Sequence, residues 1–207
     1  MKKANRQTID SKRRTPKQTR ARDTLEVIFD ATARVIEEEG RSALNTNRVA
    51  ERAGISIGTL YQYFANKEAI LCAMARRELE EAGVAVMRAI SGSAGDPVRL
   101  AIRALISAFE HRREVRRIAM DTLASEGFGA ELGENVEKVA QMLAAESGRL
   151  VPGQAGPIPA SSLFVLTRAV NGVLRAAAQE ESPYLGTEEF EDNLVRLVQS
   201  YLGALRN

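Results

Sequence analysis

The chain of 207 residues is long enough for one sizeable domain or two small ones, and its hydrophobic content of 44% argues against global disorder. One cysteine (Cys72) and one histidine (His111) exclude an intramolecular disulfide, a zinc finger with two histidines and a histidine-rich metal site. The net charge of +2 is unevenly spread, since residues 1–22 hold nine basic side chains and one acid. The composition favours helices, because Ala, Leu, Glu and Arg are abundant, tryptophan is absent and there are no alternating β-branched runs. We therefore predict an all-α fold, and we expect no metal and no cofactor.

The first predicted element is a basic, flexible arm over residues 1–22. Such an arm is either a solubilising tail or a contact to the phosphates or minor groove of DNA. A helix is then predicted over residues 23–39, and Gly40 ends it. Its apolar stripe should cover the back of the next two helices, whereas Glu37, Glu38 and Glu39 predict a solvated charged face.

Two short helices joined by a tight turn follow between residues 45 and 67. Thr46 is the predicted cap of the first, because a hydroxyl can accept a hydrogen bond from an unpaired amide at a helix start. Val49, Ala50 and Ala53 form an apolar stripe at helical spacing. Gly54 comes next and is the residue that most easily adopts the left-handed conformation ending a helix.

Ser56 is the predicted cap of the second helix, which spans residues 57–64 with Leu60 and Phe64 facing inward. The residues left for its outer face are mostly polar or aromatic: Ile57, Gly58, Thr59, Tyr61, Gln62 and Tyr63. A short second helix with such a face, directly after a glycine turn, is typical of a helix-turn-helix that enters the major groove of DNA.

This stretch resembles the DNA-binding motif of the tetracycline-repressor (TetR) family of bacterial transcription regulators. The resemblance runs from about Leu25 to Leu71 and rests on these residues: Thr46, Val49-Ala50, Ala53-Gly54-Ile55-Ser56, Gly58-Thr59-Leu60-Tyr61, Tyr63-Phe64 and Lys67-Glu68. It implies a helix-turn-helix domain over residues 23–67 and a helical ligand-binding and dimerisation domain over residues 68–207. It also implies a dimeric repressor that a small molecule releases from double-stranded operator DNA.

The resemblance also suggests which residues contact DNA. Thr59 and Gln62 are the candidates for base edges, Ile57 for a thymine methyl group, and Tyr61 and Tyr63 for phosphates. The remaining candidates, for the DNA backbone and the start of the recognition helix, are Thr46, Asn47, Ser56, Gly58 and Lys67.

The rest of the chain predicts six more helices. Asn66, Asp96 and Thr187 are expected caps. The helices are predicted from Asn66 to about Ile90 and over residues 97–110, 114–125, 131–149, 160–179 and 188–205, with breaks at Gly127 and Gly129 and a Pro/Gly-rich loop over residues 151–159.

A ligand cavity among these helices is implied by the resemblance alone. Its candidate wall residues are Met74, Phe109, Met120, Leu123, Met142, Phe164, Thr167, Arg168 and Asn171. For each of them, ordinary core or surface is the commoner role. The helices over 160–179 and 188–205 are the candidates for homodimerisation, with Ala169 and Gly172 permitting close approach; packing within one chain is the alternative.

Two common enzyme signatures, the P-loop and G-x-G-x-x-G, are missing from the sequence. We therefore expect no catalytic residue. The alternatives are a helical module that binds a protein partner and not DNA, or an activator of the same fold. With no signal peptide and no long apolar run, a cytoplasmic protein without membrane contact is expected.

Overall fold

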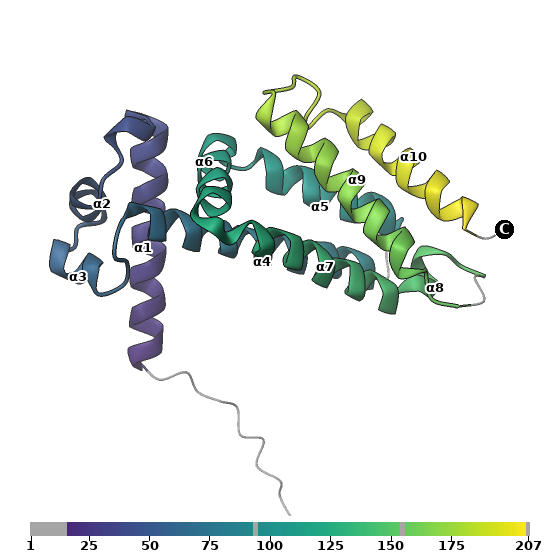
Figure 1. The fold of residues 1–207 in the computed structure, drawn as a ribbon, viewed down its shortest axis with the longest axis horizontal. Helices are drawn as coiled ribbons and strands as arrows, with labels where there is room; N and C mark the ends of the chain where they lie inside the picture. Colours follow the sequence, from purple (N-terminus) through teal and green to yellow (C-terminus); the bar gives the residue numbers. More distant parts are fainter. Residues whose placement is uncertain (1–15, 93–94, 154–155, 206–207) are drawn as a thin grey trace, which may run out of the picture.

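The computed structural model of the chain describes residues 16–92, 95–153 and 156–205, and every regular element in these ranges is helical (Figure 1). The all-α prediction is therefore confirmed. The elements are α1 (Pro16–Glu39), η1 (Arg41–Ala43), α2 (Thr46–Ala53), α3 (Ile57–Tyr61), α4 (Lys67–Ser91), α5 (Pro97–Glu110), α6 (Arg113–Leu123), η2 (Ala124–Phe128), α7 (Gly129–Ala145), α8 (Ser147–Leu150), α9 (Ala160–Gln179) and α10 (Glu188–Ala204). Within the described ranges, none of the helices has the length and apolar character needed to cross a bilayer.

Four predicted helix caps are confirmed by their hydrogen bonds. Ser56 accepts from the amide of Thr59, Asn66 from Ala69 at 2.8 Å, Asp96 from Val98 and Thr187 from Phe190. Each cap satisfies an amide that has no partner inside its helix. The residues at which α3, α4, α5 and α10 start therefore follow from local sequence.

Other helix ends differ from the prediction. The first helix begins at Pro16, seven residues earlier than expected, with proline at a helix start, where its missing N–H is not needed. Residues 1–15 of the predicted arm lie outside the described residues. The helix α3 ends at Tyr61 because the next two amides, of Gln62 and Tyr63, bond to carbonyls three residues back, which tightens the last turn.

The predicted break near residue 127 is present, but it differs in detail. Gly127 has φ 85° inside the π-helical segment η2, and α7 begins at Gly129 directly after it. The helix predicted over residues 131–149 ends at Ala145 and is followed by the separate single turn α8.

One hydrophobic core joins α1–α3 to the start of α4 and to α6. Ile28, Val49 and Leu60 pack in it with Ile70 and Ile118. The core therefore crosses residue 67, the predicted boundary between the two domains. The start of α4 and the helix α6 therefore share one packed interior with α2 and α3.

A second core holds α5, α7, α9 and α10 together, through residues such as Val98, Ala140, Leu163, Leu174 and Leu194. The 25-residue helix α4 connects the two cores and packs alongside both α5 and α6. At about 1.5 Å per residue it is about 37 Å long. In Figure 1, α2 and α3 lie on one side of α1, while α5, α7, α9 and α10 extend to the other side along α4.

Candidate nucleic-acid interface

The start of α2 is capped by Asn45, so the prediction of Thr46 as the cap is wrong by one residue. The Asn45 side-chain oxygen accepts a hydrogen bond of 2.9 Å from the Arg48 amide, and its amide nitrogen donates to the Ala43 carbonyl. Thr46 is the first helical residue instead, and its hydroxyl lies 3.2 Å from the Tyr61 hydroxyl. Thr46 therefore links α2 to α3.

The turn between the two helices is built on Gly54, as predicted. Gly54 has φ 67° and ψ 28°, the left-handed conformation that glycine adopts without steric cost. The amide of Ile55 then bonds to the Ala50 carbonyl at 3.1 Å, which closes the end of α2. Gly54 and Ile55 thus connect the two helices, and Ser56 already caps α3.

The helix α3 is fixed on its inner side and open on its outer side. Leu60 is fully buried and Phe64 is buried after it, as predicted. On the outside, Tyr61 is 53% exposed and Ile57 37% exposed, and Gln62 is exposed too. A large aromatic and an aliphatic side chain open to solvent beside polar ones indicate a contact surface.

The ten candidate DNA-contact residues fall into two groups. Six are exposed: Asn47, Ser56, Ile57, Gly58, Tyr61 and Gln62. The other four, Thr46, Thr59, Tyr63 and Lys67, are half-buried. Tyr63 packs against the first core, and the Lys67 ammonium donates to the Leu44 carbonyl at 3.2 Å. Lys67 is thereby held beside the start of α2.

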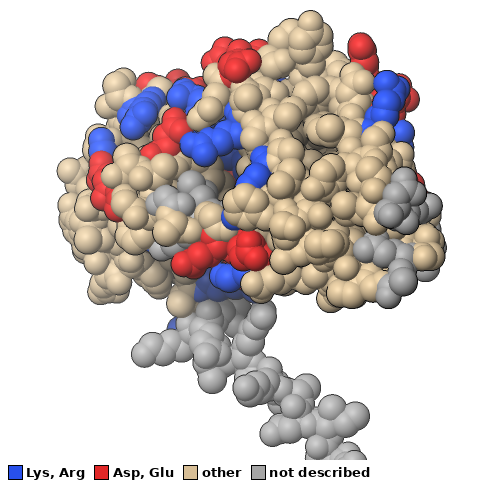
Figure 2. Space-filling view, turned by 45° about the vertical axis from the view of Figure 1, so that its right-hand side comes forward, with Lys and Arg blue, Asp and Glu red and all other residues tan. Residues whose placement is uncertain are grey.

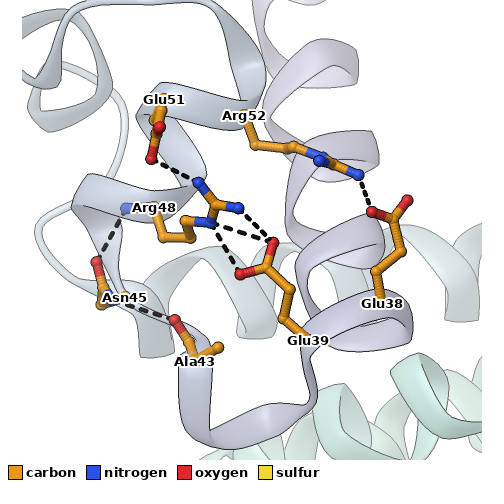
Figure 3. A network of polar contacts seen from close by, with 7 residues as sticks. All are labelled: Glu38, Glu39, Ala43, Asn45, Arg48, Glu51 and Arg52. Carbon is orange, nitrogen blue, oxygen red and sulfur yellow. Dashed lines mark hydrogen bonds and ion pairs between the residues drawn. The ribbon is translucent and has the colours of Figure 1, made fainter.

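Two arginines of α2 are paired with acids (Figure 3). Arg48 binds Glu39 through two parallel contacts of 2.8 Å and Glu51 through a third of 2.7 Å, while Arg52 pairs with Glu38. The hydrogen bonds from Arg48 hold the pKa of Glu39 below its usual value. Glu38 and Glu39 therefore join α2 to the end of α1. Glu38 is exposed, in agreement with the predicted solvated face, whereas Glu39 is half-buried.

A cavity of about 120 Å³ lies between α4, α5, α7, α9 and α10. That is roughly ten times the space that holds one water molecule. Its walls are mainly apolar, and Phe109, Thr167 and Asn171 of the predicted set line it. Met120 lines an adjoining hollow of about 90 Å³.

The other predicted wall residues lie away from this cavity. Met74 and Leu123 are buried in the first core, whereas Met142 and Phe164 are exposed and Arg168 stacks on the Phe164 ring. Helical periodicity finds two opposite faces of a helix but does not decide which face the other helices cover. Sequence reasoning missed Arg116, the charged residue of the cavity wall, because an arginine is rarely buried.

The outer faces of α9 and α10 carry exposed apolar and small residues at helical spacing. On α9 these are Val165, Ala169, Gly172 and Val173; on α10 they are Leu197, Ser200, Ala204 and, partly buried, Tyr201. Figure 2 shows uncharged side chains over much of one face of the molecule, with the charged ones gathered in clusters.

Throughout the described ranges, no group of three His, Cys, Asp or Glu side chains is placed to hold a metal ion.

The region that contains α2 and α3 is similar to known bacterial regulatory proteins. Residues 28–74 match the family model of bacterial regulatory proteins, tetR family. An HTH-type transcriptional regulator of Mycobacterium tuberculosis is 28% identical over 75% of this chain and 76% of its own length. The HTH-type transcriptional repressor KstR of Mycolicibacterium smegmatis is 39% identical over 28% of this chain and 29% of its own.

The fold as a whole also has a solved counterpart. A TetR-family transcriptional regulator from Streptomyces coelicolor superposes with a TM-score of 0.59 at 25% identity, over 87% of this chain and 98% of that one. The likeness therefore extends beyond the matched segment to the helices that follow it.

Proposed function

We propose that the chain is a DNA-binding transcription regulator of the TetR family of bacterial regulatory proteins, and that it acts as a dimeric repressor released from its operator by a small molecule. The observation that carries the proposal is the α2–Gly54–α3 unit. Its buried side is anchored by Leu60, and its outer side presents Tyr61 and Gln62 to solvent. An outer face of this chemistry suits hydrogen bonds to phosphates and to base edges in a major groove.

The proposed dimer forms through α9 and α10. One recognition helix of five residues reads few base pairs, and dimeric readers contact two half-sites about 34 Å apart. The stripe of Val165, Ala169, Gly172 and Val173 lets the backbone of a second copy approach closely. Together with Leu197 on α10 it would complete a four-helix interface.

A matched pair of variants tests this interface. Val165 and Val84 are equally exposed, at 51% and 52%, but Val84 lies on α4. Val165→Glu places a charge in the proposed interface and should convert the dimer to a monomer, whereas Val84→Glu should leave the mass unchanged. Light scattering after gel filtration measures both. A dimeric Val165→Glu protein would place the interface elsewhere.

The proposed release mechanism uses α4. This helix lines the cavity with Leu79, Val86 and Ile90 and reaches the first core with Ile70. A ligand that favours one position of α4 would change the separation of the two recognition helices in a dimer. Reversing a 99:1 equilibrium requires the ligand to prefer one state about 10⁴-fold.

Selection of bound fragments from the source genome by the purified protein is the primary test. We expect recovery of one inverted repeat, at low salt and with the dimer intact. A reporter with that repeat placed across its promoter should be silenced by the protein. Increased expression would favour an activator, and no enrichment of any fragment would favour a protein-binding module.

A further inference from the structure

Arg116 of α6 is the only buried charged side chain among the described residues, and it lies in the cavity wall. The residue is 6% exposed and lines both the 120 Å³ cavity and the adjoining hollow. Its guanidinium carbon stands 4.4 Å from the centre of the Phe109 ring. One nitrogen donates to Glu78 of α4 at 2.7 Å. The cation is thus held in place on two sides.

The guanidinium has hydrogen-bonding capacity left over. It carries five N–H donors, and in the described part of the chain Glu78 is the one acceptor they reach. Burial lowers the pKa of Arg116 and raises the pKa of Glu78, so both carry the cost of desolvation. A buried charge pair is stable when further hydrogen bonds satisfy its remaining donors. An anion in the cavity would supply them.

The rest of the cavity is suited to an apolar body. Its walls include Ile90, Val98, Ile102, Leu143 and Leu202. Along α4 it reaches from Leu79, near Arg116, to Ile90, which is a length of about 16 Å at about 1.5 Å per residue. The cation therefore lies toward one end of a long apolar space.

We propose that the ligand is an amphipathic carboxylic acid whose carboxylate binds Arg116 and whose apolar chain extends along α4 and α5. This inference rests on the proposed function, since it names the chemical class of the releasing ligand. The two carboxylate oxygens accept two parallel hydrogen bonds from the planar guanidinium of arginine. An alcohol has one uncharged oxygen and cannot form this pair of bonds.

The same contact connects the ligand to the DNA-binding unit. The ligand carboxylate competes with Glu78 for Arg116 and so loosens the contact between α4 and α6. Next to Glu78, Arg77 pairs with Glu26 of α1. At the start of α6, Arg112 pairs with Asp30 of α1 at 2.9 Å. Binding of the acid would therefore change the contact between α4 and α6 close to the ion pairs that join each of these helices to α1.

Calorimetric titration of the full chain tests the proposal with three acids, hexanoate, decanoate and 4-phenylbutanoate, and their matching primary alcohols. We expect at least one acid to bind the wild type more tightly than its alcohol, by about 10- to 100-fold, the factor that a charge-assisted hydrogen bond provides. Three acids without binding, or alcohols that bind as well as the acids, would overturn the proposal.

Variants separate the anchoring role from a structural one. Glu78→Gln removes the competing carboxylate, so its melting temperature should rise more on addition of the acid than that of the wild type. The double variant Arg116→Met/Glu78→Gln leaves no buried charge and should lose the preference for acids over alcohols. Arg168→Met is the control, because Arg168 also stacks on a phenylalanine, at 4.6 Å, but lies outside the cavity wall.

The two proposals fail in different ways. If the protein recovers an inverted repeat from the genome but binds none of the acids, the proposal of a DNA-binding regulator stands and the proposal of an acid ligand is wrong. If an acid binds through Arg116 and no DNA is recovered with or without it, the cavity assignment stands and the regulator proposal is wrong. Release of the recovered repeat by the acid, and its loss in the double variant, would support both.

Discussion

The hydroxyl of Tyr61 offers the sharpest test of the proposed DNA-contact face. Tyr61→Phe removes one oxygen and leaves the ring in place. In the free protein that oxygen is 3.2 Å from the Thr46 hydroxyl on an exposed surface, so its loss should lower the free energy of unfolding by about 1 kcal/mol or less. The fold and the proposed dimer should therefore survive the change.

The effect on DNA binding should be larger. A hydrogen bond from the Tyr61 hydroxyl to a phosphate is charge-assisted and contributes about 1.5–3 kcal/mol. Its loss should weaken binding about 10- to 150-fold for each half-site. Because the hydroxyl is neutral, the dependence of affinity on salt should keep its slope. Lys67→Met, in contrast, should reduce that slope by about 1 for each half-site.

Fluorescence anisotropy with the genome-selected duplex at several salt concentrations measures both quantities. Tyr184→Phe is the matched control: this tyrosine is 64% exposed in the turn between α9 and α10, away from α3. Unchanged affinity of Tyr61→Phe, or an equal loss in Tyr184→Phe, would refute the assignment of Tyr61 to a phosphate.

Three further predictions concern stability. Leu60→Ala truncates a fully buried side chain and should lower the free energy of unfolding by about 2–5 kcal/mol in urea titrations; a loss below about 1 kcal/mol would mean that α3 does not depend on it. Gly54→Ala puts a side chain at φ 67° and should cost about 1–2 kcal/mol, whereas Gly133→Ala, in a helix with open space around it, should stabilise by up to about 1 kcal/mol. Because Arg48 lowers the folded-state pKa of Glu39, their contact stabilises the fold above about pH 4 and is lost as the pH falls through that folded-state value. Unfolding titrations of Glu39→Gln should therefore show a weaker loss of stability in acid than the wild type, and an identical profile would contradict the pairing.

The local features of the DNA-binding unit could be read from the sequence. Ser56 and Asn66 cap their helices with their own side chains, and Gly54 provides its own left-handed turn. Leu60 and Phe64 face inward at helical spacing. Each of these depends on atoms within a few residues along the chain, so a sequence window contains the whole cause.

Local rules became ambiguous where two adjacent residues could serve the same purpose. Asn45 and Thr46 are both good caps, and the sequence alone favours neither strongly. In the folded chain Asn45 bonds both the Arg48 amide and the Ala43 carbonyl. Thr46 is then free to meet Tyr61, fifteen residues away, on α3. The choice was made by the packing of α3 against α2.

What only the tertiary structure decided is the second half of the molecule. The periodicity of α9 marks two faces, but the packing of α5 and α10 determines that Thr167 and Asn171 turn toward the cavity while Phe164 stays exposed. The pairing of Arg116 with Glu78 joins residues 38 positions apart. Such contacts depend on how whole helices pack against one another. The residues near an arginine in the sequence do not determine its distant partner, so local sequence predicts an exposed side chain even for an arginine that is buried.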